Sequence, residues 1–563
     1  MKLFHHADGR TTCGPASHIK YEGFHVLRLK GSPYDLAFQH GALLAHVIGR
    51  GPLPFFASYL DTFLRHSSMG RAGSTVASVL QRVLRARVVE RWPPFLRATA
   101  AGLSDGAGLP EELVLKAFAM PDAVLHAVSI FGRLTGVPAA AGCACPPLGC
   151  TSAVAGPSRT RRGKLLHARN LDFTGVGRWD AEPVIAFHEP DDGLPFVGLS
   201  AAGLVGGGIT GMNSAGLTFV VHQHFPTKVD LDGEPVGLIG ERILREAHSV
   251  DEAITLLDRH RPMGGWTYVV SDPKRAIAYE VLPGARRIVK MVDDCLGYAN
   301  AYQHPDLVAA EHDVYPAYRQ ANHARHRRVW AALREVSSEH SETTLAEILD
   351  DHSGGRPAGE RSAVFGDTIR TPYTVQSVIF RPSDRKFWVG QGPAPTSAGP
   401  YLGFDLETRG PAPSLPTLRP RDGRLSPSAA ASEAYARAYR AFLEYDDVKA
   451  ARQQVSDALS SCPDDDRLHH AAGLLALRDR DLAAAERHFG VAALRANVSA
   501  RRARGHLGRA WALEALGRSA EARSERLAAR HADVEDPAVG GLLGRRMGDL
   551  GRIPIELIYA DVP

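Results

Sequence analysis

Short β-prone runs of apolar residues recur between residues 150 and 406, and this pattern predicts strands. One run at 150–155 is followed by a polar, Gly-containing turn and by a second run at 164–173. The two runs predict a β-hairpin with Cys150 at the start of one strand and with Arg169 and Asp172 at the end of the other. The other predicted strands are 184–187, 196–199, 217–221, 267–270, 276–281, 375–380 and 386–389, with a turn expected at 211–216.

Helical patterns precede and interrupt these strands. Ser32 followed by Pro33 marks a helix start, because Ser caps helices and Pro fits their first position. Strand pairs separated by helical blocks favour antiparallel sheets with helices on their outer faces. Apart from a strand at 26–29, the region from about 20 to 145 is expected to be mostly helical. Further helices are expected at 75–92, 111–130, 237–260 and 305–334.

The C-terminal part has a different pattern. Residues 407–429 are rich in proline and predict a semi-rigid linker. Residues 430–535 are rich in alanine and contain a degenerate repeat, in which Ala450, Ala484 and Ala522 are separated by 34 and 38 residues. The 34-residue spacing resembles the tetratricopeptide repeat, with a plain helical bundle as the alternative. Residues 536–563 are expected to form a tail.

Composition narrows the classes of protein. The chain has 563 residues, 44% hydrophobic and 23% charged, which predicts a globular protein of two or three domains. The net charge of +4 gives little support to a nucleic-acid partner. No apolar stretch of about 18 residues predicts a membrane span, and the N-terminus does not resemble a secretory signal, so a cytoplasmic protein is expected.

The candidate nucleophile is Cys150. A thiol beside the guanidinium of Arg169 and the carboxylate of Asp172 is a plausible nucleophile with its positioning groups, although a strand-end salt bridge would give the same pattern. Cys143 and Cys145 lie nearby, but the three cysteines lack the paired Cys-x-x-Cys of a zinc site, so a metal or redox module is a remote alternative.

Two histidines form a second candidate cluster. His222 and His224 would share one face of a strand, where they could bind a metal, line a substrate pocket or simply pack; a pocket or packing role is favoured over a metal. No Gly-rich phosphate loop and no Gly-x-Ser-x-Gly elbow is present. We therefore expect neither a metal nor a cofactor.

Several motifs occur together in an order that resembles a known family. The set resembles the N-terminal-nucleophile hydrolases, and in particular the C45 peptidase group typified by acyl-coenzyme A:6-aminopenicillanic acid acyltransferase. The resemblance covers roughly residues 20–406. The motifs that carry it are 149–152, 163–173, 203–221, 29–34 with 40–41, and 374–378 with 388–389.

The resemblance implies an α+β protein, with an N-terminal-nucleophile αββα sandwich followed by the all-α helical repeat domain. It also implies self-cleavage between Gly149 and Cys150, which would divide a mainly helical segment, 1–149, from a nucleophile-bearing core, 150–406. The new α-amine of Cys150 has a reference pKa of about 7.7–8.0 and can take the thiol proton without a histidine.

The same resemblance suggests roles for the surrounding residues. Asp172 would orient the new amine, and Arg169 would contact the nucleophile or the substrate. Asn300 is the candidate oxyanion donor, with a helix cap as the alternative. Asn170 and Asn213 are weaker candidates for the same role; Asn170 is also a weak candidate for the substrate pocket, and Asn213 is expected to be a turn residue.

These features together predict a cysteine amidohydrolase or acyltransferase. An acyl group would pass from a small-molecule acyl amide or acyl thioester to the Cys150 sulfur, and then to water or an amine. The alternative is a protein-interaction scaffold, in which the repeats at 430–535 bind a protein partner and the nucleophile domain is inert or regulatory.

Overall fold

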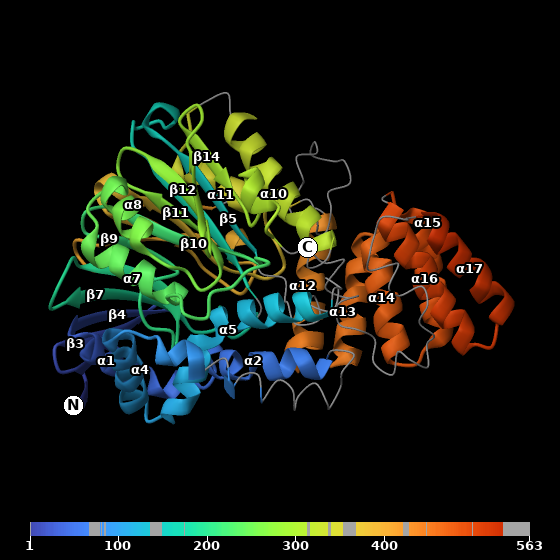
Figure 1. The fold of residues 1–563 in the computed structure, drawn as a ribbon, viewed down its shortest axis with the longest axis horizontal. Helices are drawn as coiled ribbons and strands as arrows, with labels where there is room; N and C mark the ends of the chain where they lie inside the picture. Colours follow the sequence, from blue (N-terminus) through green and yellow to red (C-terminus); the bar gives the residue numbers. More distant parts are fainter. Residues whose placement is uncertain are drawn as a thin grey trace.

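The structure is a computed structural model with two large sheets and a C-terminal helical region (Figure 1). It describes residues 2–66, 86–135, 149–173, 175–311, 316–335, 339–352, 368–419, 427–445, 447–497 and 499–532, together with Val79, Arg82 and Val83. The predicted α+β class is therefore confirmed. The predicted tail at 536–563, part of the predicted helix at 75–92, and Cys143 and Cys145 lie outside the described residues.

The larger sheet has the strand order β1-β2-β3-β4-β7-β8-β9-β10-β11-β12-β13. All its neighbouring strands are antiparallel except β4 and β7, which are parallel. The strands are β1 (Leu3–His5), β2 (Thr11–Cys13), β3 (Ala16–Tyr21), β4 (Phe24–Gly31), β7 (Pro183–Pro190), β8 (Phe196–Ala201), β9 (Thr210–Asn213), β10 (Thr218–His224), β11 (Gly265–Ser271), β12 (Ala276–Leu282) and β13 (Ala285–Lys290).

The smaller sheet has the order β14-β5-β6-β15-β16-β17-β18, and its neighbouring strands are antiparallel. Its strands are β5 (Gly149–Ala155), β6 (Leu166–Asp172), β14 (Cys295–Tyr298), β15 (Thr374–Arg381), β16 (Lys386–Gly390), β17 (Tyr401–Asp405) and β18 (Gly410–Pro411). An apolar cluster fills the space between the two sheets, with Val154, Val220 and Val378 among its members. The hairpin predicted around Cys150 is the β5–β6 pair.

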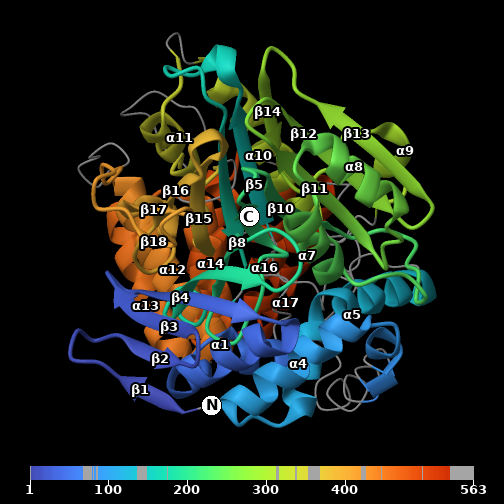
Figure 2. The same cartoon turned by 90° about the vertical axis from the view of Figure 1, so that its left-hand side faces the viewer.

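Helices cover the outer faces of both sheets (Figure 2). On the larger sheet lie α1 (Pro33–Ile48), α7 (Val236–Glu246) and α8 (Val250–Arg259), while α10 (Pro316–Glu335) and α11 (Glu342–Leu349) lie on the smaller one. Ser32 caps α1 as predicted, with its hydroxyl accepting from the Asp35 N–H. The remaining helices of this part are α2 (Pro52–His66), α4 (Pro94–Ala107), α5 (Glu111–Thr135) and the single turn α9 (Pro305–Val308).

The N-terminal segment contains the helices α1, α2, α4 and α5, but its beginning differs from the prediction. Its first part forms the four strands β1–β4, which extend the larger sheet through the parallel pairing of β4 with β7. Only the 26–29 run had an apolar pattern strong enough to predict a strand. The turn expected at 211–216 is also shorter than predicted, because residues up to Asn213 pair with β8 and β10 as strand β9.

The C-terminal helices lie beside the two-sheet region (Figure 1). Asp447 and Asp481 each cap a helix, accepting from Ala450 and Ala484 N–H, at positions one 34-residue interval apart. The helices are α12 (Pro427–Tyr445), α13 (Val448–Ser461), α14 (Asp466–Arg478), α15 (Leu482–Arg495), α16 (Ser499–Ala515) and α17 (Ser519–Ala532). The tetratricopeptide-like repeat stays a prediction.

Part of the predicted linker is bound to the smaller sheet. Strand β18 pairs with β17, and Leu418 exchanges two backbone hydrogen bonds with Tyr401. Helix α12 then packs against the two-sheet region, where the Tyr439 ring lies 5.8 Å from the Tyr373 ring. Among the described helices, none is long and apolar enough to cross a membrane.

Candidate active site

The β5–β6 ladder places the candidate nucleophile. Gly149 pairs with Asp172, Cys150 with Leu171, and Ser152 with Arg169. Because successive side chains of a strand point to opposite faces, Arg169 lies on the face of Cys150, between the sheets. Asp172 lies on the other face, toward α10.

Three side chains from different elements each contact a different atom of Cys150. Arg169 Nη2 donates to the Cys150 sulfur at 3.4 Å, and Asn300 Oδ1 accepts from the Cys150 N–H at 2.5 Å. Arg325 Nη1, from α10, donates to the Cys150 carbonyl oxygen at 2.8 Å. The sequence predicts that Arg169 and Asn300 lie near Cys150, and the structure places both there.

Burial and charge act on the thiol in opposite directions. Cys150 is 5% exposed, and this burial raises the pKa of its thiol, while the nearby Arg169 and Arg325 cations lower that pKa. Arg169 is itself fully buried, and burial lowers the pKa of its guanidinium. Its remaining contacts are with Thr210 Oγ1 and with the Val221 carbonyl oxygen at 3.0 Å. These contacts hold Arg169 with its Nη2 atom in hydrogen-bond contact with the Cys150 sulfur.

Asp172 is a buried carboxylate with one unused oxygen. Its Oδ1 accepts from Thr374 Oγ1 at 2.6 Å. Its Oδ2 has no hydrogen-bond partner among the described residues and lies 3.8 Å from Arg325 Nη1. Burial raises the pKa of Asp172, and Arg325 lowers it. The structure shows no direct hydrogen bond between Asp172 and Cys150.

Arg325 is a site residue that the sequence analysis misses. It also donates to Thr151 Oγ1 at 3.0 Å and to Asn322 Oδ1. It lies in a helix that the periodicity predicts, but no local motif distinguishes it from the other arginines of that helix. Only the packing of α10 on β5 and β14 reveals its role.

Asn300 contacts Cys150 in a different way from the one predicted. Its Nδ2 donates to the Gln223 carbonyl oxygen at 2.9 Å, so Oδ1 is the atom that faces the Cys150 nitrogen. Both neighbours require this orientation of the amide, because one is an acceptor and the other a donor. Asn300 follows β14 and is neither a helix cap nor, in this arrangement, a donor free for an oxyanion.

The other predicted pocket residues have structural partners. Asn170 points to the opposite face from Arg169, donates to the Leu349 carbonyl and accepts from Ser377. His222 bonds Ser152 Oγ, and His224 bonds Thr267 Oγ1 and Glu311. Asn213 bonds backbone atoms around its turn, as expected.

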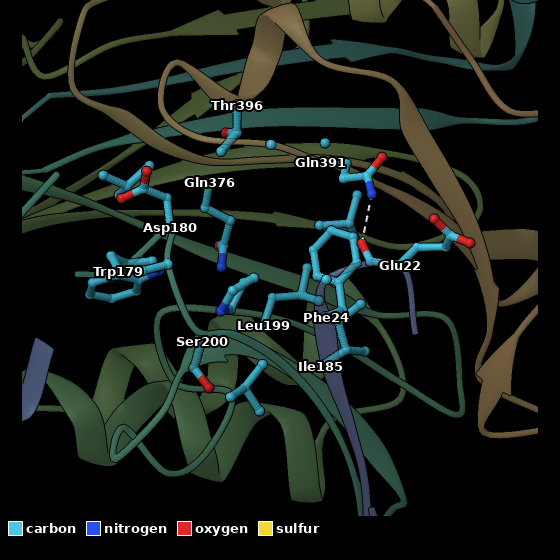
Figure 3. A pocket seen from close by; sticks show the side chains of 18 of the residues that line it. Glu22, Phe24, Trp179, Asp180, Ile185, Leu199, Ser200, Gln376, Gln391 and Thr396 are labelled. Carbon is cyan, nitrogen blue, oxygen red and sulfur yellow. Dashed lines mark hydrogen bonds between the residues drawn. The ribbon is translucent and has the colours of Figure 1, made fainter. Parts of the chain in front are cut away.

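Two cavities are lined by residues of the sheets and of the N-terminal helices. One, of about 270 Å³, has Phe24, Asp180 and Gln376 in its wall (Figure 3), and the other, of about 150 Å³, is largely apolar and contains Phe56, Trp92 and Phe118. Trp179, Leu199 and Ser200 belong to both walls. Neither cavity is lined by Cys150, Asn170, His222 or His224. That Asn170 and the two histidines line a substrate pocket stays a prediction.

Within the described ranges, no group of three His, Cys, Asp or Glu side chains is arranged to hold a metal ion.

Comparison with known families supports an acyl-transfer enzyme. The family model of acyl-coenzyme A:6-aminopenicillanic acid acyl-transferase matches residues 159–392, which is less than half of the chain. The matched part is thus similar to an acyltransferase and N-terminal-nucleophile hydrolase family, and it contains Arg169, Asp172, Asn300 and Arg325. The match begins after Cys150, so it does not include the nucleophile. No curated protein matches the chain.

Proposed function

We propose that the protein is a self-cleaving cysteine amidohydrolase or acyltransferase whose nucleophile is Cys150. One observation carries the proposal: the sulfur, nitrogen and carbonyl oxygen of this one residue are each bonded by a different buried polar side chain. A structural cysteine needs no such contacts, because a buried thiol packs as a small apolar group. The similarity of residues 159–392 to an acyl-transferase family supports the same chemistry.

Self-cleavage would proceed through a thioester. The Cys150 sulfur attacks the Gly149 carbonyl carbon, the C–N bond breaks, and the proton of the thiol ends on the Cys150 nitrogen. Water then hydrolyses the thioester, which leaves a carboxylate on Gly149 and a free thiol and α-amine on Cys150. An α-amine titrates near neutral pH and can act as the base for the thiol.

The new α-amine would have two partners. Asn300 Oδ1 already accepts from the Cys150 nitrogen. The Asp172 Oδ2 atom would lie 2.9 Å from a Cβ on Gly149, so it is close to the bond that self-cleavage would break. A carboxylate and an amide oxygen are suitable acceptors for an ammonium group. We therefore assign both residues to the amine rather than to the oxyanion.

Turnover would use the same sulfur. The thiolate, stabilised by Arg169, attacks the acyl carbon of an amide or thioester, and the leaving group takes a proton from the α-ammonium of Cys150. The acyl group then passes from the sulfur to water or to an amine, which regenerates the thiol. Arg169 acts here by favouring the charged form of sulfur, because a cation within about 4 Å lowers the pKa of a thiol.

Trapping of the acyl-enzyme tests this proposal. Purified protein is mixed with a panel of N-acyl amides and acyl thioesters, quenched in acid and analysed by peptide mass spectrometry. An acyl adduct on Cys150 that forms within a turnover and decays with product release supports the mechanism. Turnover without an adduct in the wild type, or turnover retained in Cys150→Ala, contradicts it. Cys295→Ala is the matched control, because Cys295 is a buried cysteine on the neighbouring strand β14.

A further inference from the structure

Glu280 is a buried carboxyl group in strand β12. It is 0% exposed, and burial raises the pKa of its side chain. Tyr298 Oη donates to its Oε1 atom at 2.9 Å, and the Gln303 N–H donates to the same oxygen at 2.6 Å. The His304 N–H donates to Oε2 at 3.2 Å. Because backbone N–H groups can only donate, these contacts suit an ionised carboxylate, and both of its oxygens are used.

The neighbouring strands fix where the Glu280 side chain points. Ala278, two residues earlier, belongs to the apolar cluster between the two sheets, so Glu280 faces the same space. Glu280 pairs with Thr267 on β11, and directly paired residues share a face. Thr267 Oγ1 shares a hydrogen bond of 2.7 Å with Tyr298 Oη. Two strands of the larger sheet therefore bond the same tyrosine of the smaller sheet.

The three donors to this carboxyl group flank Asn300 in the chain. Residues 299–304 connect β14 to α9, and both of these elements contact β12 (Figure 2). Tyr298 precedes Asn300 by two residues, while Gln303 and His304 follow it by three and four. One carboxylate thus binds the chain both before and after Asn300, and its loss would shift the backbone there.

Asn300 connects this loop to the candidate nucleophile. Its Oδ1 accepts from the Cys150 N–H at 2.5 Å, and its Nδ2 donates to the Gln223 carbonyl oxygen at 2.9 Å. Each end of this short amide has one partner, so a small shift of the Asn300 backbone would lengthen at least one of the two bonds. Glu280 has no hydrogen bond with Cys150 in the part of the chain that the structure describes. Its effect on the nucleophile would therefore pass through the loop.

We propose that Glu280 is a positioning residue of the Cys150 site, which holds residues 299–304 so that Asn300 meets the Cys150 nitrogen. During self-cleavage this nitrogen is the leaving group of the Gly149–Cys150 bond, and afterwards it is the α-amine. Because it serves that reaction, the role rests on the proposed function. Glu280 itself takes part in no covalent step.

Hydrogen exchange tests the coupling without any reaction. Full-length Cys150→Ala protein keeps the backbone N–H of residue 150, and Glu280→Gln is added to it. An amide side chain accepts through one oxygen only and presents N–H groups to the remaining donor, so the loop loses at least one bond. Peptides that cover residues 149–152 and 299–304 should exchange about fivefold faster, as for the loss of ~1 kcal/mol of hydrogen bonding. Unchanged exchange at 149–152 would overturn the role.

Self-cleavage tests the role in the thiol-bearing chain and needs no substrate. The chain is made by cell-free translation, and its uncut fraction is followed over time. Glu280→Gln should slow cleavage about tenfold, because a small displacement beside reacting atoms has effects of at least that size. Asn300→Ala removes the amide that transmits the effect, so Glu280→Gln should change the rate by less than about twofold in that background. Equal slowing in both backgrounds would show that Glu280 supports the fold and not Asn300.

Glu234→Gln is the matched control. Glu234 Oε2 also accepts from a backbone N–H, that of Arg261, at 3.2 Å, and it bonds His260 rather than residues 299–304. This variant should show the exchange and the cleavage rate of its parent. If Glu280→Gln fails to fold, which thermal melting shows, Glu280→Asp keeps the charge and shortens the reach. It should then slow cleavage in the same non-additive way.

The two measurements separate this inference from the proposed function. Faster exchange at 149–152 in the Glu280→Gln protein, together with an uncut wild type, would overturn the proposed function alone, since the coupling itself would stand. A wild type that is cut, with Glu280→Gln cut at the same rate, would overturn the role of Glu280 alone. Where the Asn300→Ala chain is cut too slowly to follow, the exchange result decides.

Discussion

Gly149 and Asp172 face each other across the β5–β6 ladder, and a Cβ on Gly149 would lie 2.9 Å from Asp172 Oδ2 and 3.0 Å from Arg325 Nη2. The absence of a side chain at this position therefore allows the buried carboxylate and guanidinium to approach the bond before Cys150. Gly149→Ala should displace one of them and slow self-cleavage at least tenfold, measured as the fraction of uncut chain over time.

Gly49→Ala is the control for this substitution. Gly49 has an α-helical φ of −62° at the end of α1, and a Cβ there would meet nothing within 4 Å. The Gly49→Ala variant should be cleaved between Gly149 and Cys150 at the wild-type rate. Cleavage of Gly149→Ala at the wild-type rate would show that the close approach of Asp172 is irrelevant to processing.

Arg325 should set the pH dependence of the site through Asp172. Its cation lowers the pKa of Asp172 against the rise caused by burial. In Arg325→Met that pKa should rise further, so Asp172, which in the proposed mechanism holds the α-amine, would be protonated up to a higher pH. The acid limb of the pH–rate profile should move to higher pH, with a lower rate at neutrality.

Arg327→Met, an exposed position on the same helix, should leave the profile in place. If Arg325→Met lowers the rate equally at every pH, Arg325 does not act through the protonation of Asp172.

How far the sequence predicts this site depends on how local each feature is. Cys150, Arg169 and Asp172 lie on one hairpin, so the pattern of two short runs is enough to bring them together. Ser32 and Pro33 likewise predict the start of α1 from local capping chemistry. Arg325 reaches the site through α10, and such long-range packing leaves no mark in the local sequence.

The same distinction explains what the sequence leaves open. Cys13 and Ala16 are the only buried apolar residues of β1–β3, too few for a local apolar pattern, and β3 joins the sheet by pairing with β4. His222 and His224 alternate as a binding pair would, but their partners Ser152 and Glu311 come from distant elements. A buried polar side chain can bind a metal or substrate, or it can belong to the core, and partners from distant elements decide which.

Asp122 should make stability depend on pH. Burial raises the pKa of this carboxyl to about 7. The folded state therefore keeps a proton that the unfolded chain loses near pH 4, and the associated stability is present below pH 4 and lost as pH rises through about 7.

Asp122→Asn keeps the oxygen that accepts from the Val236 N–H and does not titrate. The Tm of this variant is measured from pH 4 to 8 and should exceed that of the wild type increasingly toward pH 8. Each unit by which the folded-state pKa of Asp122 exceeds its unfolded value corresponds to ~1.4 kcal/mol of stability. Asp457→Asn, at an exposed position of α13, should give the wild-type curve. A constant offset between Asp122→Asn and wild type would contradict the assignment.

Helix α12 should support the two-sheet region and not only the helices that follow it. Tyr439 is buried and packs on Tyr373, whose carbonyl oxygen accepts from the Phe173 N–H directly after β6. Tyr439→Ala should lower stability by about 3–5 kcal/mol, as for other buried aromatic residues, and reduce turnover at elevated temperature.

Leu494→Ala, at a side chain that is 79% exposed on α15, should leave the Tm unchanged. Because α12 packs on the two-sheet region through Tyr439, deleting residues 427–563 should lower the Tm of the remaining chain and not simply remove a separate module. An unchanged Tm in the deletion would show that α12 is dispensable to the two-sheet region.

Intact-mass analysis of the purified wild type and of Cys150→Ala, paired with turnover of an N-acyl amide, tests the role of Cys150. We predict a wild type in two fragments, 1–149 and 150–563, that is active, and a Cys150→Ala variant that stays in one piece and is inactive. An uncut wild type with full turnover, or a Cys150→Ala variant that is cut and active, would contradict the proposal.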